Sequence, residues 1–193
     1  MSCAAIILAA GESRRMGRPK ALLPYHGGTF VSVLAEKLSE TCSPLCVVFG
    51  YQAQDLMAWT PAPVIAVENT NYRYGMLTSL QAGLRAIPEL PERILFTLVD
   101  HPAIKTSTIR LLLECAAPLA IPRYSGKRGH PVIMSREIAS EILAEPMTSK
   151  LNHVIDRHAA EIHYIEVSDP GVRDDIDDPQ HYEELLAREG ARA

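Results

Sequence analysis

The sequence predicts an α/β fold with three layers, in which helices cover both faces of a mostly parallel sheet and the C-terminal third is less regular. Apolar segments of strand length alternate with segments whose apolar residues recur at helical spacing, and strand followed by helix occurs four times. The strand segments are almost continuously apolar, as expected for parallel strands that are buried on both faces. Ligands of such folds bind at the carboxyl ends of the strands.

The elements follow one another in the order of a Rossmann-like fold. Continuous apolar runs predict strands at residues 3–8, 45–49, 64–67, 94–99 and 119–121. Helical spacing predicts helices at residues 30–39, 52–59, 76–86 and 106–115, the first capped by Thr29. The C-terminal third adds expected strands at 131–134 and 162–167, and expected helices at 136–143, at 151–157 and after Pro179.

Composition and charge exclude several classes of protein. The chain of 193 residues is 47% hydrophobic and 22% charged, which suits a single globular domain over residues 1–193. A net charge of −4 argues against nucleic-acid binding, and the cations cluster locally, which favours a small anionic ligand. The four cysteines form no CxxC pair, and no run approaches the roughly 20 apolar residues of a membrane span. We therefore expect a cytoplasmic protein with reduced thiols and no membrane partner.

The most informative segment is the loop that follows the first expected strand. Residues 11–20 contain two glycines and four cations, a composition that suits a polyphosphate and would also suit a basic surface loop. Glycines let backbone N–H groups approach phosphate oxygens, and arginine and lysine neutralise the phosphate charge. The P-loop pattern and the dinucleotide pattern G-x-G-x-x-G are both absent, so this would be a nucleotide loop of another kind.

This loop resembles the signature of the MobA-like nucleotidyltransferases. The residues that match are Leu8-Ala9-Ala10-Gly11-x-Ser13-x-Arg15-Met16-Gly17-x-x-Lys20. The Ala9-Ala10 pair is similar to the molybdenum cofactor cytidylyltransferase branch, whereas the guanylyltransferase branch carries a double glycine at this point. The resemblance covers nearly the whole chain. It implies transfer of a nucleotide, with CMP from CTP favoured, to the phosphate of molybdopterin or molybdenum cofactor, with release of pyrophosphate.

The resemblance also implies roles for particular residues. Arg15, Lys20 and Asp100 would be the catalytic residues, and Mg²⁺ would be the cofactor. The residues that would bind the nucleotide are Leu8, Ala9, Ala10, Gly11, Ser13, Arg15, Gly17, Lys20, Asn71, Gly75 and Ser79. Residues 1–120 would form the nucleotide-binding part and residues 121–193 the acceptor-binding part.

Asp100 is the strongest single candidate for a metal ligand. It ends an apolar strand that Pro102 stops, and Mg²⁺ prefers one or two carboxylates together with substrate phosphates and water. A helix cap or a structural hydrogen bond is the alternative for this carboxylate. Residues 98–102 also resemble the metal-binding segment of the family, in which Gln is more usual where His101 stands.

Residues 69–79 form a polar segment after the third expected strand. Side-chain amides can read the edge of a base and a helix N-terminus can hold an anion, but a polar turn before a capped helix would have the same composition. The part from Asn71 to Ser79 resembles the Gly-Met-x-x-Ser-Leu segment that lines the nucleotide site of the family. Thr78 stands where Ser is more usual.

A second basic loop spans residues 123–131. It would suit the phosphate of an acceptor, and it would equally suit an exposed hairpin turn. Gly129-His130-Pro131 resembles the Gly-His-Pro element of the family near the acceptor. Within the resemblance, the acceptor would be bound by His101, Arg128, Gly129 and His130.

The acidic residues 174–178 precede the last expected helix. Acids at a helix N-terminus complement the helix dipole, and this alone would explain them. The segment Asp175-Ile176-Asp177-x-Pro179 also resembles the Asp-Ile-Asp-Thr-Pro segment of the family, which favours Asp177 over Asp175 as a second metal ligand.

One departure from the family concerns the acceptor. Cytidylyltransferases of this branch often carry a Gly-Asp-x-Gly-Ala-Arg element after the Gly-His-Pro strand, and residues 145–150 of this chain lack its glycines. Two other functions therefore stay open. The first is a nucleotidyltransferase for another acceptor, of the GTP or sugar-phosphate type. The second is a non-catalytic carrier that passes the molybdenum cofactor to a client molybdoenzyme.

Overall fold

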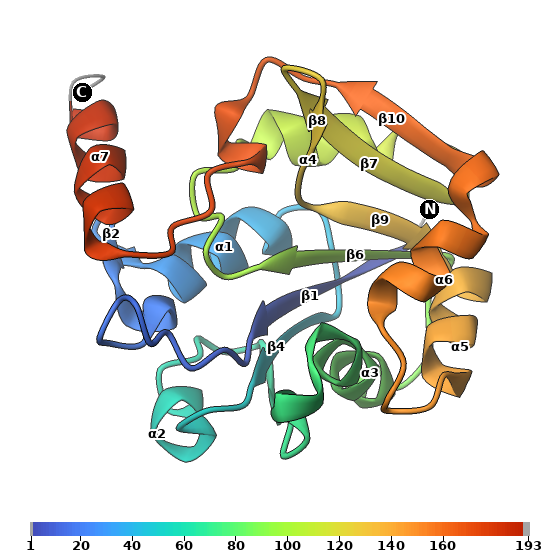
Figure 1. Ribbon diagram of the computed structural model, residues 1–193, viewed down its shortest axis with the longest axis horizontal. Coiled ribbons are helices and arrows are strands. Elements are labelled where there is room, and N and C mark those ends of the chain that lie inside the picture. Colours follow the sequence, from blue (N-terminus) through green and yellow to red (C-terminus); the bar gives the residue numbers. More distant parts are fainter. Residues whose placement is uncertain (1, 191–193) are drawn as a thin grey trace.

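An eight-stranded mixed sheet forms the centre of the computed structural model, which describes residues 2–190 (Figure 1). Seven strands follow the order β10-β7-β9-β6-β1-β4-β5, and β8 pairs only with β7. Their bounds are β1 Cys3–Ala9, β4 Leu45–Phe49, β5 Ile65–Glu68, β6 Arg93–Leu98, β7 Leu119–Tyr124, β8 Lys127–Arg128, β9 Val132–Ser135 and β10 Ile162–Glu166. A separate hairpin consists of β2 (Pro24–Tyr25) and β3 (Gly28–Thr29).

In residues 2–190, seven α-helices and four short 3-10 helices accompany these strands. The α-helices are α1 Phe30–Ser39, α2 Ala53–Met57, α3 Met76–Ala86, α4 Thr106–Leu113, α5 Arg136–Ala144, α6 Leu151–Arg157 and α7 Pro179–Gly190. The 3-10 helices are η1 Lys20–Leu22, η2 Tyr72–Tyr74, η3 Ala159–Glu161 and η4 Pro170–Val172. Within the described part of the chain, no helix is long and apolar enough to cross a membrane.

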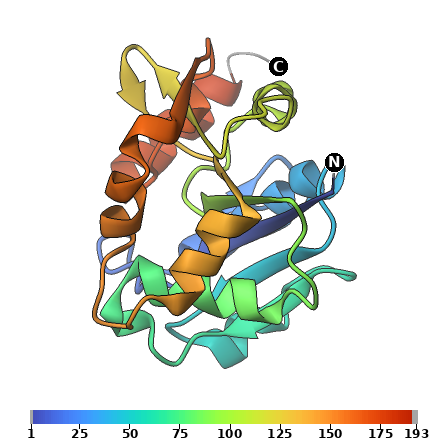
Figure 2. The ribbon, with the colours of Figure 1, turned by 90° about the vertical axis from the view of Figure 1, so that its right-hand side faces the viewer.

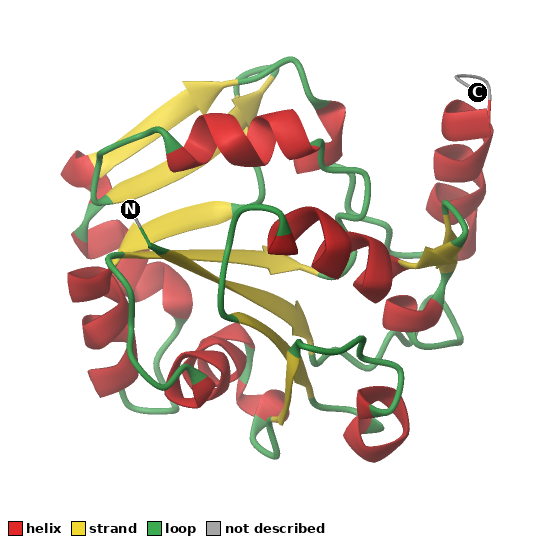
Figure 3. Ribbon diagram, turned by 180° about the vertical axis from the view of Figure 1, so that it is seen from behind, coloured by secondary structure: helices red, strands yellow, loops and turns green. Residues whose placement is uncertain are grey.

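The side chains of β1 show how the three layers form. The whole strand is buried, and successive side chains point to opposite faces. Ala5 and Ile7 belong to the core that includes residues of α1 and α4, whereas Ile6 and Leu8 belong to the core that includes residues of α3, α5 and α6. Figure 2 shows helices on both sides of the sheet, and Figure 3 shows α1 and α4 in front of it. The predicted three-layer α/β/α fold is confirmed.

The strand directions also agree with the prediction. The strands β6, β1, β4 and β5 run parallel to one another, as βαβ units require. Only β9 among the seven ordered strands runs against its neighbours, because the chain turns back through β8 and inserts β9 between β7 and β6. The C-terminal third is therefore the less regular part. The β7 strand extends to Tyr124 instead of ending at residue 121, since β8 pairs with Arg123 and Tyr124.

The last helix returns to the N-terminal half of the fold. Tyr182 of α7 packs edge-on against Phe30 at a ring-centroid distance of 5.8 Å, and its hydroxyl donates a hydrogen bond of 2.6 Å to the Pro24 carbonyl. Leu185 is buried in the same core. These contacts hold the segment before α7 beside the carboxyl ends of β1 and β6, at the left of Figure 1.

Candidate active site

A cavity of about 920 Å³ opens at the carboxyl ends of the central strands. The loop after β1, the end of β6, the η2 segment and the start of α3 line it. Most of the residues predicted to bind nucleotide are in the lining, namely Leu8, Ala9, Ala10, Gly11, Ser13, Arg15, Lys20, Gly75 and Ser79, and Asp100 and Asp177 join them. Two predicted residues, Gly17 and Asn71, are not part of the lining.

Hydrogen bonds within the basic loop fold it upon itself. Ser13 and Gly17 both have positive φ angles, +50° and +72°, and the Gly17 N–H donates to the Ser13 carbonyl at 3.1 Å. The Lys20 N–H donates to the Ser13 hydroxyl at 3.2 Å. Met16 anchors the loop because its side chain is buried in the core below. These hydrogen bonds and the buried Met16 give a defined shape to the loop that we predicted to hold phosphate.

A substitution of Gly11 can show whether the loop needs a glycine here for ligand binding or for the packing of the protein. A Cβ atom added at Gly11 would meet no heavy atom within 4 Å, although Gly11 lines the cavity. We expect Gly11→Ala to leave the melting temperature unchanged and to weaken nucleotide binding by roughly tenfold, since the methyl group would stand between the backbone and the phosphates. Calorimetric titration with nucleotide measures this effect, and unchanged affinity would contradict it.

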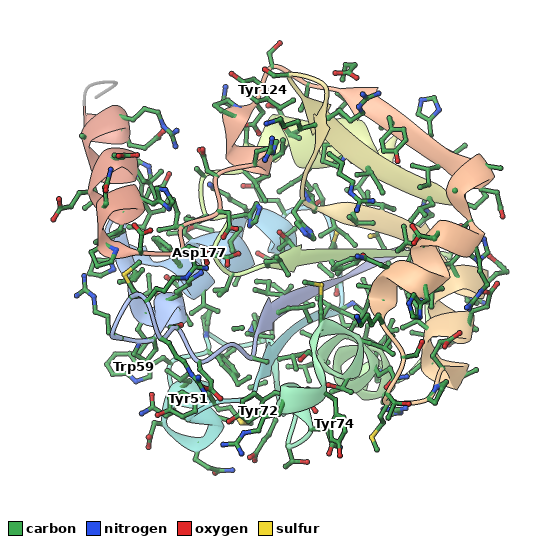
Figure 4. The ribbon with its side chains drawn as sticks, viewed as in Figure 1. Tyr51, Trp59, Tyr72, Tyr74, Tyr124 and Asp177 are labelled. Carbon is green, nitrogen blue, oxygen red and sulfur yellow. The ribbon has the colours of Figure 1, made fainter. Side chains whose placement is uncertain are left out.

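Three carboxylates meet at the edge of this cavity. Asp100 follows β6, and Asp175 and Asp177 precede α7; one oxygen from each lies within 4.8 Å of the others. Ile176 explains why they meet. Its side chain is buried, and its N–H donates to the Asp100 carbonyl at 3.1 Å. With the middle residue of Asp175-Ile176-Asp177 held in the core, the two flanking carboxylates approach Asp100; Asp177 is labelled in Figure 4.

Two cations of the basic loop neutralise these carboxylates. The Lys20 ammonium lies 3.0 Å from Asp100 Oδ2 and 2.5 Å from Asp177 Oδ1, and the Arg15 guanidinium also pairs with Asp177. Burial alone would lower the pKa of Lys20, but the two carboxylates raise it above its ordinary value. Burial raises the pKa of Asp175, and the negative charges of Asp100 and Asp177 raise it further.

The donor set suits a hard divalent cation. Mg²⁺ takes oxygen ligands and commonly uses one or two carboxylates together with substrate phosphates. The structure brings both predicted metal ligands, Asp100 and Asp177, into one cluster and adds Asp175. The helix-cap alternative for Asp100 does not hold, because Asp169 accepts hydrogen bonds from the Lys105 N–H and the Thr108 hydroxyl at the start of α4.

His101 contacts Asp100, and His130 packs against His101. His101 is buried, and its Nδ1 lies 3.0 Å from Asp100 Oδ1. Burial opposes ionisation of Asp100, but His101 and Lys20 outweigh it and hold the pKa of Asp100 well below its usual range. The His130 ring lies 5.1 Å from the His101 ring, and burial lowers the pKa of His130 to about 3, so His130 is neutral near pH 7.

The four residues predicted to bind the acceptor, His101, Arg128, Gly129 and His130, are not in the lining of this cavity. Gly129 has a packing role. A Cβ atom at this position would lie 2.1 Å from the Val172 carbonyl oxygen, so only glycine lets the segment between β8 and β9 approach η4 this closely. Arg128 is exposed in β8. Their role in acceptor binding stays a prediction.

Asn69, which was not among the predicted site residues, organises the polar segment after β5. Asn69 is buried, and its amide donates to the Thr78 and Ser79 hydroxyls at 3.1 and 3.0 Å. Its Oδ1 accepts the Asn71 N–H at 2.9 Å. The available signal was an asparagine directly after an apolar strand, a residue that commonly bonds to the backbone two positions ahead. Asn69 thereby holds the start of α3 against the cavity.

Aromatic residues at the rim were also missed. Tyr72 lines the cavity and packs over Gly50, where a Cβ atom would lie 2.5 Å from the Tyr72 Cβ. Figure 4 labels Tyr72 close to the exposed Tyr51 and Tyr74. Arg73 follows in the same 3-10 turn, lies 4.0 Å from Glu12 and lines the cavity. These residues could contact the base or ribose of a nucleotide, because stacking on an aromatic ring is tolerant of base identity.

A mostly parallel α/β sheet with a glycine-containing cationic loop and carboxylates at its carboxyl edge has the features of a nucleotide-binding protein. Residues 5–162 match the MobA-like NTP transferase domain. The chain belongs to this family, so the predicted family is confirmed.

Curated relatives agree with this assignment. The chain is 27% identical to a molybdenum cofactor cytidylyltransferase of Escherichia coli K12, over 84% of this chain and 86% of the relative. It is 31% identical to the nicotine blue oxidoreductase of Paenarthrobacter nicotinovorans, over 94% of this chain and 95% of that protein. A probable molybdenum cofactor guanylyltransferase of Mycobacterium tuberculosis H37Rv is 38% identical over 58% of this chain and 54% of its own length. 

The fold is also found among solved structures. A nucleotidyl transferase from Methanothermobacter thermautotrophicus superposes with a TM-score of 0.83 at 22% identity, over 100% of this chain and 99% of the other.

Proposed function

We propose that this protein is a Mg²⁺-dependent nucleotidyltransferase that transfers CMP from CTP to the phosphate of molybdopterin or molybdenum cofactor and releases pyrophosphate. The observation that supports this most is the meeting of Arg15 and Lys20 with Asp100 and Asp177 in one cavity at the carboxyl ends of the strands. Phosphate-binding cations and carboxylates for a metal are what transfer between phosphates needs.

The proposed reaction exchanges one phosphoanhydride bond for another. An oxygen of the acceptor phosphate attacks the α-phosphorus of the nucleotide, the bond from that phosphorus to the bridging oxygen of the β-phosphate breaks, and pyrophosphate leaves with the electron pair. The attacking phosphate is already ionised near pH 7, so the protein needs no general base. Arg15 and Lys20 would bind the β- and γ-phosphates and stabilise the charge that develops on the leaving group.

Asp100 and Asp177, with Asp175 beside them, would hold the metal ion. Bound there, Mg²⁺ would supply positive charge that stabilises the negative charge of the reacting phosphates. His101 would keep the Asp100 carboxylate in place, because its Nδ1 lies 3.0 Å from Asp100 Oδ1. We assign nucleotide binding to residues 1–120 and acceptor binding to residues 121–193, in which Arg128 would contribute charge.

The preference for CTP rests on the Ala9-Ala10 pair and on the likeness to the cytidylyltransferase. The likeness to a guanylyltransferase favours GTP as the second candidate. The name of the nicotine blue oxidoreductase raises a different activity, a redox reaction of nicotine blue.

Pyrophosphate release measured with Mg²⁺, molybdenum cofactor and CTP, GTP or ATP tests the proposal. We expect release with CTP at least about tenfold faster than with GTP, because a mismatched base leaves buried polar groups unpaired. Pyrophosphate release with GTP alone would support nucleotidyl transfer and contradict the proposed preference for CTP. Binding of molybdenum cofactor without pyrophosphate release would favour the carrier. A redox change of nicotine blue without pyrophosphate release would favour the oxidoreductase.

A further inference from the structure

The Lys20 ammonium lies inside the carboxylate cluster to which we assign the metal ion. It is bound to Asp100 Oδ2 at 3.0 Å and to Asp177 Oδ1 at 2.5 Å. The same two residues supply oxygen atoms to the group of three carboxylates that lies within 4.8 Å. The side chain of Lys20 is only 11% exposed, so this is a held position and not a passing surface contact. A cation therefore already stands where a divalent ion would bind.

Hydrogen bonds fix the backbone of Lys20, whereas rotation of its side chain can bring the ammonium to a different partner. The Lys20 N–H donates to the Ser13 hydroxyl, and its carbonyl accepts the Leu23 N–H at 3.0 Å. The ammonium sits at the end of a flexible four-carbon chain with rotatable bonds. A change of partner therefore needs rotation of one side chain and no movement of the loop.

Asp177 also holds the second cation that we assign to phosphate. Arg15 pairs with Asp177 although its own side chain is 68% exposed and lines the open cavity. Lys20 and Arg15, the two cations that we assign to the triphosphate, therefore both pair with Asp177, a carboxylate that we assign to the metal ion. Entry of a divalent ion alone would place two positive charges beside the Lys20 ammonium within a few ångströms, an arrangement that is strongly unfavourable at a partly buried site.

We propose that Lys20 is a displaceable counter-ion that closes the carboxylate site to a divalent cation until a nucleoside triphosphate enters. The triphosphate gives the ammonium, and Arg15, a new set of oxygen partners, and the carboxylates become free for the metal at the same time. Metal and triphosphate then bind together, each raising the affinity of the protein for the other by the same factor. This inference rests on the proposed function, since that function supplies the triphosphate.

The experiment measures binding of Mn²⁺, used as the probe ion, by the loss of the free-ion electron paramagnetic resonance signal. Wild-type protein is compared with Lys20→Met, Lys20→Gln and Lys20→Arg, each without nucleotide. We expect Lys20→Met and Lys20→Gln to bind Mn²⁺ at least about tenfold more tightly than wild type, because a neutral side chain removes the competing charge. Lys20→Arg keeps the charge, so its affinity should stay near that of wild type. Lys150→Met, which removes an exposed lysine at the start of α6, is the control for net charge.

A second arm repeats the titration with a non-hydrolysable CTP analogue, after the affinity of the free analogue for Mn²⁺ has been measured. Wild type should then gain affinity for Mn²⁺ at least about tenfold, and Lys20→Met should gain much less. Equal affinity of wild type and both neutral variants for Mn²⁺ without nucleotide would overturn the proposal. Thermal unfolding of each variant with and without Mn²⁺ checks that the variant is folded. If no variant folds, tight binding of Mn²⁺ by the wild-type protein without nucleotide would still overturn the proposal.

The two hypotheses fail differently. Tighter Mn²⁺ binding by the neutral variants together with no transfer from any nucleotide would support the counter-ion and contradict the proposed reaction. Transfer from CTP together with unchanged Mn²⁺ affinity of the neutral variants would do the reverse.

Discussion

Asp100→Asn is expected to lower kcat for pyrophosphate release by at least about a thousandfold, since it removes the negative charge at the centre of the proposed metal site. Asn has nearly the same shape as Asp, so the cavity should keep its form. The Asp100 carboxylate lies against both Lys20 and His101, so its loss removes one of the two carboxylates that Lys20 contacts and the carboxylate that His101 contacts. Initial rates at saturating CTP and Mg²⁺ measure the effect.

Asp156→Asn is the matched control for Asp100→Asn. Asp156 is an exposed residue of α6, so the same change of charge should leave the rate within about twofold of wild type. A folded Asp100→Asn protein that keeps more than a tenth of the wild-type rate would contradict the assignment of Asp100 to the metal.

Gly129→Ala is expected to destabilise the fold by about 2–3 kcal/mol and to lower the melting temperature by roughly 4–12 °C. The added Cβ atom would lie 2.1 Å from the Val172 carbonyl oxygen, a backbone atom that cannot rotate away. The His130 N–H donates to the same oxygen at 2.8 Å, so this hydrogen bond would be disturbed as well. Because η4 leads into residues 175–177, the carboxylate cluster should shift and the rate of transfer should fall.

Gly11→Ala gives the comparison for Gly129→Ala, since both add one methyl group and only Gly129 has backbone in the way. Differential scanning calorimetry separates them. A melting temperature of Gly129→Ala within 1 °C of that of Gly11→Ala would show that the segment between β8 and β9 moves away from η4 without a loss of stability, contrary to this expectation.

The fold could be predicted because its main determinants are local. Each apolar run from β1 to β6 has the length and continuity of a buried parallel strand, and Thr29 forms a capping box with Ser32 at the first residue of α1. The loop from Gly11 to Lys20 could be predicted for the same reason, since its glycines, cations and anchoring Met16 lie within ten residues.

The features that escaped prediction depend on contacts between distant residues. The insertion of β9 between β7 and β6 is not encoded in its own four residues. Asp169 caps α4 although it lies more than sixty positions later in the sequence, and no residue near Thr106 indicates this contact. The sulfur of Cys42 lies 3.4 Å from that of Cys3, although these residues are far apart in the sequence. Sequence separation carries no information on such pairs.

The candidate site was predicted in part for a related reason. The segment Asp175-Ile176-Asp177 indicated two carboxylates with an apolar residue between them, but only the hydrogen bond from Ile176 to Asp100 brings them to β6. The pairing of Lys20 with these carboxylates could not be foreseen, because a phosphate-binding lysine is expected to point at its phosphate and not at the metal ligands.

The fate of labelled phosphates tests the central claim most directly. The protein is incubated with Mg²⁺, molybdenum cofactor and CTP that carries ³²P at either the α- or the γ-position. Nucleotidyl transfer predicts that the α-label appears in a nucleotide-linked cofactor and that the γ-label appears in pyrophosphate. Release of the γ-label as inorganic phosphate, with the α-label left on CDP, would mean that the other bond breaks and would contradict the account.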